Sequence, residues 1–215
     1  MQQIDLREYK KELRENSKAY RRSMAPQDKA DRDARIRRRL RKLYQYPRAR
    51  TILCYVSKSI EVDTSGIIQD ALAAGKRVAV PRCIEGTRLM EFYLIHSMDD
   101  MEKGSFGVME PIVSKCRKLT DFRRSICIVP ALGYDLEGYR LGYGGGYYDR
   151  FLSGYRGLKV GAIYSACVHS RLPRGKFDVP VDVLLTEDYL RTIRRPGGPK
   201  RPPRNMGRPG SGKFI

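Results

Sequence analysis

The chain has 215 residues and is strongly basic, with 43 Lys and Arg residues against 24 Asp and Glu residues. Hydrophobic residues make up 41% of it, which is enough to build a core at this length and excludes a wholly disordered chain. No apolar run approaches the roughly 20 residues of a membrane-spanning helix, so that class is excluded as well. The first residues lack the apolar core of a secretory signal, and we therefore expect a cytoplasmic protein.

The positive charge is concentrated at the two ends of the sequence. Residues 1–50 contain 17 basic and 7 acidic residues, and residues 191–215 contain 8 basic residues and no acidic one. Residues 51–190 are nearly neutral, with 18 basic and 17 acidic residues. Such a basic chain first suggests a polyanionic partner such as RNA. The neutral middle weakens that interpretation for the central fold.

The end of the chain differs in composition from the rest. Residues 194–215 are rich in Pro, Gly and Arg and contain few apolar side chains, so they cannot bury enough surface to offset the entropy of ordering. We therefore divide the chain into a folded domain, residues 1–193, and a disordered basic tail, residues 194–215. This tail is either a solvated segment that aids solubility or a weak, salt-sensitive contact for a polyanion such as RNA.

Cysteine, histidine and serine residues indicate no site of their own. The five cysteines are widely spaced and include no CxxC pair, which predicts neither a disulfide framework nor a zinc site. His96 and His169 stand alone, and we expect both to be ordinary surface or loop residues. No GxSxG motif supports a Ser-His-Asp hydrolase.

The first fifty residues predict two helices, because apolar residues recur at helical spacing before and after an interruption at Ala25-Pro26. The pattern then changes to short runs typical of strands. These runs are residues 51–56, 77–80, 90–95, 126–129, 160–164 and 183–185.

Helices are predicted between these strands. Asp63 or Thr64 can cap a helix that Gly75 ends, and another helix starts within residues 146–152. Apolar strands separated by helices predict a three-layer α/β/α domain with a mostly parallel sheet that is covered on both faces. In such folds ligands bind in the loops beyond the carboxyl ends of the strands, and we look for the chemistry there.

The most informative segment is a glycine-rich run after the strand predicted at 126–129. Four glycines fall within the five positions 142–146 and lead into a predicted helix. A backbone this free can turn several N–H groups toward one point, which at a helix N-terminus forms a phosphate cradle. Arg140 can add a fork for phosphate oxygens, and Asp149 can hold a magnesium ion that bridges them.

Glycine-rich composition alone is equally compatible with a tight structural turn that exposes the aromatic pair Tyr147 and Tyr148. The spacing matches neither the GxGxxG loop of dinucleotide-binding proteins nor the GxxxxGK[ST] loop of P-loop proteins. Residues 207–213 fit GxxxxGK, but Phe214 replaces the required Ser or Thr and no strand pattern precedes the run, so we reject it.

The run from Arg140 to Asp149 resembles the signature of the 5-formyltetrahydrofolate cyclo-ligase family, also called the 5,10-methenyltetrahydrofolate synthetases. Other segments agree with that family in order and spacing, so the resemblance covers about residues 6–190. These segments are residues 10–14, 55–57, 61–64, 80–82, 107–111, 129–135 and 179–187. The family fold is a three-layer α/β fold like that of the ribose-5-phosphate isomerase and CoA-transferase group.

The resemblance implies an enzyme that converts 5-formyltetrahydrofolate and MgATP to 5,10-methenyltetrahydrofolate, ADP and phosphate. Transfer of the γ-phosphoryl group to the formyl oxygen gives an imidate phosphate, which N10 of the folate attacks with loss of phosphate. The protein's task is then to align the reactants and neutralise charge. The alternatives are a basic RNA-associated protein that keeps this fold without catalysis and another phosphate-ester or nucleotide enzyme on the same scaffold.

The resemblance also implies the site residues, although it identifies no general base. The implied ATP contacts are Lys10, Arg14, Arg140, Leu141, Gly142, Tyr143, Gly144, Gly145, Gly146, Tyr147 and Tyr148. The implied folate contacts are Val56, Glu61, Tyr143, Gly144, Gly145, Gly146 and Tyr147, and the implied magnesium ligands are Asp149 and Asp182. Without the resemblance, Lys10 and Arg14 are typical of a solvated basic helix face, and Val56 is typical of a core residue. Glu61 is then typical of a carboxylate at a helix start, and Asp182 of a turn.

Overall fold

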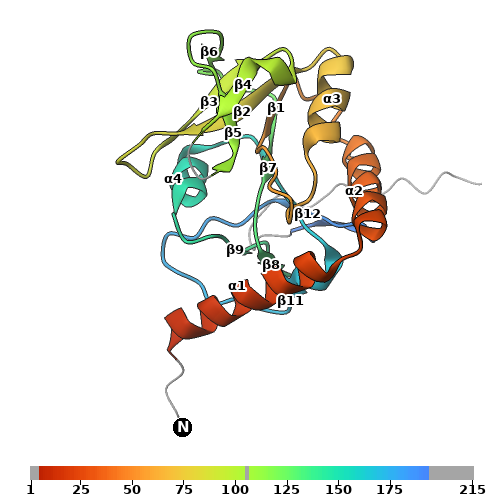
Figure 1. The fold of residues 1–215 in the computed structure, drawn as a ribbon, viewed down its shortest axis with the longest axis vertical. Helices are drawn as coiled ribbons and strands as arrows, with labels where there is room; N and C mark the ends of the chain where they lie inside the picture. The colour runs from red at the N-terminus through yellow and green to blue at the C-terminus, as the bar shows by residue number, and fades with distance from the viewer. Residues whose placement is uncertain (1–4, 105–106, 194–215) are drawn as a thin grey trace, which may run out of the picture.

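The computed structural model describes residues 5–104 and 107–193 of the chain. The predicted tail, residues 194–215, lies outside the described residues. The described chain folds around an eight-stranded sheet with the order β13-β12-β10-β7-β1-β2-β3-β6, and helices pack against this sheet (Figure 1).

Five adjacent strands form a parallel centre. In this centre β1 pairs with β2 and β7, and β10 pairs with β7 and β12. The strands outside it, β3 and β6 on one side and β13 on the other, are antiparallel to their neighbours. The mostly parallel sheet predicted from the sequence is thus confirmed. The strands are β1 (Thr51–Cys54), β2 (Arg77–Cys83), β3 (Met90–Ile95), β6 (Arg117–Lys118), β7 (Ser125–Val129), β10 (Leu158–Ala162), β12 (Val183–Leu185) and β13 (Leu190–Thr192).

The two predicted N-terminal helices are present. α1 (Leu6–Ser23) begins after Asp5, whose carboxylate accepts a hydrogen bond from the Arg7 N–H at 2.8 Å. α2 (Pro26–Arg41) begins with a proline, at a position where a helix does not use the N–H group.

The helix after β1 uses both of its predicted capping residues in different ways. α3 (Ser65–Ala73) has Thr64 at its N-cap, but the Thr64 hydroxyl donates to the Tyr55 carbonyl at 2.7 Å and makes no capping bond. The carboxylate of Asp63 instead accepts from the first helical N–H at 3.1 Å. The predicted stop is confirmed, because Gly75 follows the helix with φ of +68°.

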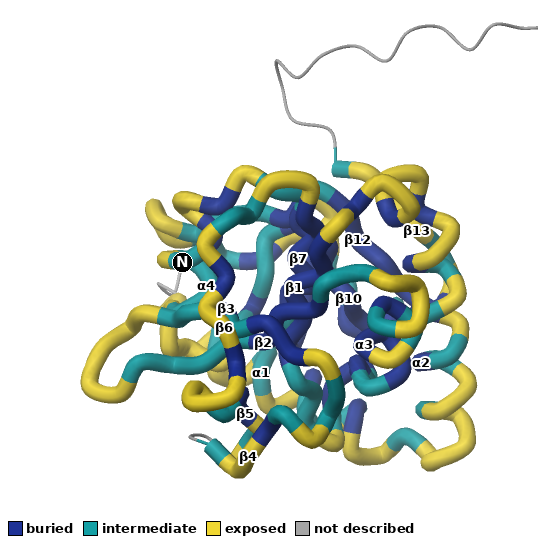
Figure 2. The backbone as a smooth tube through the Cα atoms, turned by 90° about the horizontal axis from the view of Figure 1, so that it is seen from above, coloured by how far each residue is buried: buried dark blue, intermediate teal, exposed yellow. Residues whose placement is uncertain are grey.

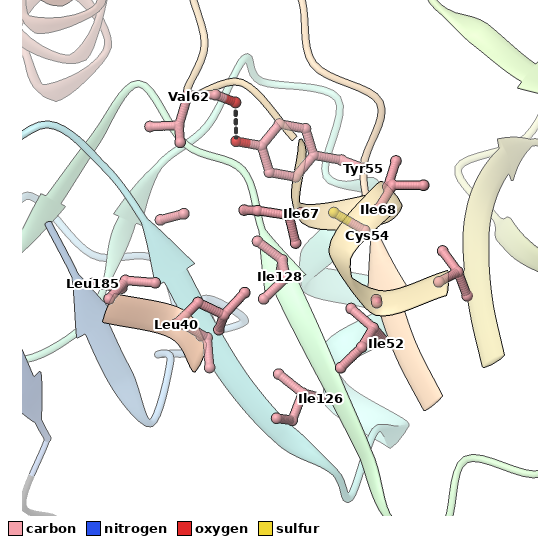
Figure 3. Packing of buried hydrophobic residues seen from close by; sticks show 14 of the residues in the cluster. Leu40, Ile52, Cys54, Tyr55, Val62, Ile67, Ile68, Ile126, Ile128 and Leu185 are labelled. Carbon is pink, nitrogen blue, oxygen red and sulfur yellow. Dashed lines mark hydrogen bonds between the residues drawn. The ribbon is translucent and has the colours of Figure 1, made fainter. Parts of the chain in front are cut away.

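α2 and α3 cover one face of the sheet. Ile36 and Leu40 from α2, with Ile67 and Ile68 from α3, pack against the side chains that the central strands direct to that side (Figure 3). The buried residues run through the middle of the molecule along β1, β7 and β10 (Figure 2). This aliphatic layer fixes the strands and therefore the loops that follow them.

The opposite face carries a mixed layer of helix and strand. α4 contributes Leu152 to it, and Tyr134 from a small sheet of order β11-β8-β9 packs so close to Gly161 that a Cβ atom there would lie 2.5 Å from the tyrosine ring. The three-layer prediction is confirmed, with one outer layer partly made of strands. Its elements are β8 (Gly133–Asp135), β9 (Arg140–Leu141), α4 (Tyr147–Gly154) and β11 (Val168–His169).

The remaining elements are short, and the cysteines are unpaired. A hairpin joins β4 (Met101–Lys103) to β5 (Met109–Pro111). All five cysteines are free, and Cys54 and Cys127 are buried in the core. Within residues 5–104 and 107–193, no helix combines the length and apolar composition needed to cross a membrane.

α1 lies across the end of the sheet at which the parallel strands finish, beside β8 (Figure 1). It is held there by Arg21, which is only 3% exposed. The Arg21 guanidinium donates to the carbonyl oxygens of Ala131 and Leu132, just after β7, at 2.7 and 2.9 Å. No sequence pattern predicts this contact, because an arginine on a basic helix normally faces solvent.

We predict that His169 makes stability depend on pH. Its ring is partly buried in β11 and burial lowers its pKa below 6.5, partly opposed by Asp135. The unfolded chain therefore takes up a proton as the pH falls below about 6.5 before the folded chain does, and stability is lost in that window. His169→Gln should reduce the loss of melting temperature between pH 7.5 and pH 5.5. The control is His96→Gln, which changes an exposed ring and should not alter the loss of melting temperature between these two pH values. Equal effects of the two substitutions would contradict the prediction.

Candidate functional site

The loops after the parallel strands meet at one edge of the sheet, which we call the carboxyl edge. Val56 and Glu61 follow β1, Tyr164 follows β10, and Glu187 follows β12. α1 lies over this edge, and the glycine-rich loop joins it from β9. Five separate segments of the sequence are thus brought together where ligands bind in folds of this class.

The glycine-rich loop, residues 142–146, connects β9 to α4. Gly144 and Gly146 have φ of +105° and +73°, values that side-chain-bearing residues rarely adopt. Gly146 is the N-cap of α4, so the loop leads directly into the end of the helix where unpaired N–H groups and the helix dipole favour an anion. The residues at 143–146 are exposed, and the loop is open to a ligand.

Arg140 and Leu141 support the loop from below and do not face the solvent. The Arg140 side chain is 4% exposed, donates to the Val179 carbonyl at 2.8 Å, and pairs with Asp149 at 2.5 Å. Leu141 is 2% exposed. The expectation that Arg140 offers a fork to a phosphate therefore differs from the structure, in which its donors face Val179 and Asp149, the latter in the helix that follows the loop.

The basic pair on α1 lies beside this loop, as its spacing allowed. Arg14 Nε donates to the Gly142 carbonyl at 2.9 Å, and Lys10 Nζ lies 3.9 Å from a carboxylate oxygen of Asp178. Both basic side chains are only partly buried. They can therefore add positive charge beside the N–H groups of the loop.

Tyr143 reaches from the loop to the segment after β1. Its hydroxyl donates to a carboxylate oxygen of Glu61 at 3.0 Å, and Lys58 Nζ lies 5.4 Å from the centre of its ring. Burial and the neighbouring Glu61 raise the pKa of the Tyr143 hydroxyl, so it stays protonated at neutral pH. Glu61 is 5% exposed, and Val56 packs against the core beside it.

A second tyrosine, which the sequence did not single out, supports this contact from inside. The Tyr164 hydroxyl lies 2.7 Å from Asp33 of α2 and 3.2 Å from the backbone carbonyl of Glu61. Burial, with Asp33 next, raises the pKa of Tyr164. The sequence could have indicated Tyr164 through its place two residues after β10, since site residues often follow the carboxyl ends of parallel strands.

Tyr147 and Tyr148 do not form the exposed aromatic pair of a structural turn. The Tyr147 hydroxyl donates to the Thr87 carbonyl, in the turn between β2 and β3, at 3.0 Å. The Tyr148 hydroxyl is buried without a hydrogen-bond partner in the part of the chain that the structure describes. Burial raises the pKa of Tyr148 well above its usual value. An unpaired buried hydroxyl is costly unless a ligand or water satisfies it.

A basic cleft of about 760 Å³ begins at the loop and runs along α4. Its volume lies in the range of small-molecule sites, roughly 300–1,000 Å³. Basic side chains outnumber acidic ones in its lining, so the cleft attracts anions. The charged lining residues are Arg88, Asp149, Arg150, Arg156, Lys159, Lys176 and Asp178.

The two predicted magnesium ligands each have a cationic partner. Asp149 lines the cleft, and its Oδ1 accepts from the Val179 N–H at 3.2 Å and contacts Arg140. Asp182 precedes β12 at the opposite edge of the sheet, where its Oδ2 accepts from the Lys159 N–H at 2.9 Å and lies 3.0 Å from Lys159 Nζ. Among residues 5–104 and 107–193, no cluster of three His, Cys, Asp or Glu residues could hold a metal on its own.

We predict that Gly144→Ala damages the loop. At φ of +105° an alanine is strained by about 1–3 kcal/mol, which should lower the melting temperature by at least about 2 °C. The displaced N–H groups should also bind a nucleotide more weakly in a calorimetric titration. Gly154→Ala is the control, because that glycine has no positive φ and open space around its Cβ position. Indistinguishable behaviour of the two variants would argue against the loop geometry.

Comparisons with known proteins agree with this geometry. Residues 6–187 match the model of the 5-formyltetrahydrofolate cyclo-ligase family. A 5-formyltetrahydrofolate cyclo-ligase of Haemophilus influenzae is 30% identical over 148 residues, 66% of this chain and 79% of that protein. One of Escherichia coli K12 is 27% identical over 171 residues, 77% of this chain and 93% of that protein.

The fold comparison gives the same result. The solution structure of 5,10-methenyltetrahydrofolate synthetase from Aquifex aeolicus superimposes with a TM-score of 0.77 at 32% identity. The match covers 91% of this chain and 98% of that one. The resemblance inferred from the glycine-rich run is confirmed along almost the whole described chain, and the protein belongs to the 5-formyltetrahydrofolate cyclo-ligase family of enzymes.

Proposed function

We propose that the chain carries out the conversion of 5-formyltetrahydrofolate to 5,10-methenyltetrahydrofolate with ATP and magnesium, and that the carboxyl edge is the site. The observation that carries the proposal is the convergence of α1, the glycine-rich loop and the segment after β1. Arg14 contacts the loop and Tyr143 of the loop contacts Glu61, so groups suited to a phosphate and groups suited to a pterin lie on either side of one short turn.

ATP occupies the loop and the basic cleft in this proposal. The N–H groups of residues 142–146 face the triphosphate together with Lys10 and Arg14, and Arg140 and Leu141 keep the loop in shape. The positive lining of the cleft and its volume of about 760 Å³ support a nucleotide there. Tyr147 and Tyr148 begin α4 beside the cleft, and Tyr148 packs inward against the core.

Of the two carboxylates proposed as magnesium ligands, Asp149 is better placed than Asp182. Magnesium usually binds one or two carboxylates together with substrate phosphates and water, so the lack of a cluster of ligands within the described residues does not oppose the proposal. Asp149 faces the cleft and makes both of its contacts through Oδ1. Asp182 forms an ion pair with Lys159, so its role as a magnesium ligand has weaker support. When bound, the ion neutralises the phosphate oxygens and helps to align them.

The folate lies on the other side of the loop. Val56, Glu61 and the loop residues from Tyr143 to Tyr147 line its place in the proposal. The Glu61 carboxylate is 5% exposed and is held by Tyr143 and by the Lys58 N–H, so it is a fixed acceptor for N–H groups of a pterin. A fixed acceptor in a poorly solvated place discriminates strongly against ligands that lack the matching donor.

The chemistry requires positioning more than a reactive side chain. The formyl oxygen attacks the γ-phosphorus and ADP leaves; N10 then bonds to the formyl carbon, the C–O bond breaks, and phosphate leaves with the N10 proton lost to the medium. Lys10, Arg14 and the loop N–H groups hold the phosphates against the formyl oxygen, while Glu61 fixes the pterin. Such alignment lowers the barrier because the reactants lose their freedom on binding and not at the reaction step.

The test of this function uses the full chain, MgATP and 5-formyltetrahydrofolate. The methenyl product absorbs in the near ultraviolet, so its formation is followed directly, and ADP and phosphate should appear in equal amounts. Omission of ATP should abolish the signal. A folded, pure chain that yields no product under these conditions would instead favour the alternative of an RNA-associated protein without catalysis.

Lys10→Ala is predicted to weaken the use of ATP. The substitution removes a charge placed beside the loop, and contacts of charged groups contribute about 1.5–3 kcal/mol, so KM for ATP should rise about tenfold or more while KM for the folate changes little. Lys11→Ala is the matched control, since Lys11 is exposed on α1 next to it in sequence. Equal KM values for the two variants would show that Lys10 does not contact the nucleotide.

A further inference from the structure

A second basic surface lies at the opposite edge of the sheet, where the parallel strands begin. In β7, β1 and β2 the first residues are in register, because Thr51 pairs with both Arg77 and Ser125. The residues just before them, Arg50, Lys76 and Arg124, therefore stand side by side across three neighbouring strands. The Arg50 N–H donates to the Arg124 carbonyl at 2.8 Å, and the Arg77 N–H donates to the Arg50 carbonyl at 2.9 Å.

These residues surround a hollow of about 740 Å³, which we call the amino-edge hollow. Its lining carries one carboxylate, that of Asp121, and Arg123 contacts it at 2.9 Å. Residues 51–190 are nearly neutral by sequence, so this gathering of positive charge is produced by the fold. The basic residues of its lining are Arg50, Lys76, Arg77, Arg123 and Arg124.

The hollow is built on a fixed frame. Lys76 Nζ donates to the Ala49 carbonyl at 2.8 Å, and Arg77 Nε donates to the Thr51 hydroxyl at 3.0 Å. Arg124 has φ of +51°, the only positive φ outside glycine among the described residues, which turns the chain so that its carbonyl meets the Arg50 N–H. Arg50 and Arg124 are exposed around this frame and can meet anionic groups. Arg123 is exposed as well, but two of its guanidinium nitrogens pair with the Asp121 carboxylate.

An exposed aromatic ring lies in the turn that leads into the hollow, five residues before Ala49 of its lining. Tyr44 is 70% exposed, in the turn that leads to Arg50, and the guanidinium of Arg48 lies 3.9 Å from the centre of its ring. Surfaces that bind single-stranded nucleic acid typically combine cations, which contact the phosphate backbone, with an aromatic ring on which a base stacks. A short polyphosphate would use the cations but gain nothing from the ring.

The last described strand also ends at this edge. Thr192 of β13 pairs with Val183, the first residue of β12, so β13 ends on the side on which the parallel strands begin. By sequence alone, residues 194–215 contain seven basic side chains and no acidic one.

We propose that the amino-edge hollow, with Tyr44, is a binding surface for single-stranded nucleic acid, separate from the folate site at the carboxyl edge. Phosphates contact Arg50, Arg123 and Arg124, and a base stacks on Tyr44. The proposal does not depend on the proposed enzymatic function, because none of these residues belongs to that site.

The test measures binding of a labelled single-stranded RNA of about 16 nucleotides by fluorescence anisotropy at several salt concentrations. The full chain carrying R50A, R123A and R124N is compared with the unmodified chain; asparagine is used at 124 because it tolerates a positive φ. We expect binding to weaken roughly tenfold near 0.1 M salt. The slope of log affinity against log salt should fall by about two, since each single-strand phosphate contact contributes about 0.7.

The matched control removes the same charge from the exposed side of α1, with R7A, K11A and R22A. It should bind RNA nearly as the unmodified chain does, and all variants are checked for an unchanged melting temperature. Equal weakening in both triple variants, or none in the first, would overturn the proposal, since total charge or residues 194–215 would then account for binding.

Tyr44→Ala separates nucleic acid from other polyanions. It should weaken RNA binding about fivefold or more, as loss of one base stack does, and leave binding of inorganic polyphosphate unchanged. Polyphosphate that binds as tightly as RNA, together with an unaffected Tyr44→Ala variant, would overturn the assignment to nucleic acid. Formation of the methenyl product by the R50A, R123A and R124N chain should equal that of the unmodified chain, which distinguishes failure here from failure of the enzymatic proposal.

Discussion

The arrangement of the site depends on the contact of Arg21 with the two carbonyl oxygens that follow β7. Hydrogen bonds from a charged donor are worth about 1.5–3 kcal/mol each, and both are formed where the guanidinium is almost fully buried. They fix α1 across the carboxyl edge. The same helix then places Arg14 on the glycine-rich loop and Lys10 near Asp178. A helix that is basic along most of its length thus acquires one buried side and one end that contacts the glycine-rich loop.

The site is also closed by a chain of polar contacts that begins in α2. Asp33 meets Tyr164, Tyr164 meets the backbone of Glu61, and the Glu61 carboxylate accepts the hydroxyl of Tyr143. Asp33, Tyr164 and Glu61 are buried, so their contacts contribute more than they would in water. The loop proposed for the phosphates and the acceptor proposed for the pterin are therefore held by the same network, which suits a reaction that depends on the relative position of two substrates.

The two edges of the sheet use positive charge differently. Beside the glycine-rich loop, Arg140 is paired with Asp149, so its charge is neutralised within the protein. In the amino-edge hollow, the register of three parallel strands collects cations against a single carboxylate, that of Asp121. The high net charge of the chain is consequently a local property of certain surfaces and not a uniform one.

Short-range patterns in the sequence predict the class of fold, the family, the four helices and six of the strands, because apolar runs, the proline at the start of α2 and the glycines of the loop depend on neighbours along the chain. They do not predict the short strands β4, β5, β6, β8, β9, β11 and β13. The family resemblance also places Lys10, Arg14, Glu61 and Tyr143 in one site. Four features follow from tertiary packing alone: Arg140 is buried under the loop, Tyr148 points inward, Arg21 anchors α1, and Arg50, Lys76 and Arg124 stand in a row. Those outcomes depend on burial and on strand register, which join residues far apart in sequence, and no local pattern records which face a side chain will take once the sheet has formed.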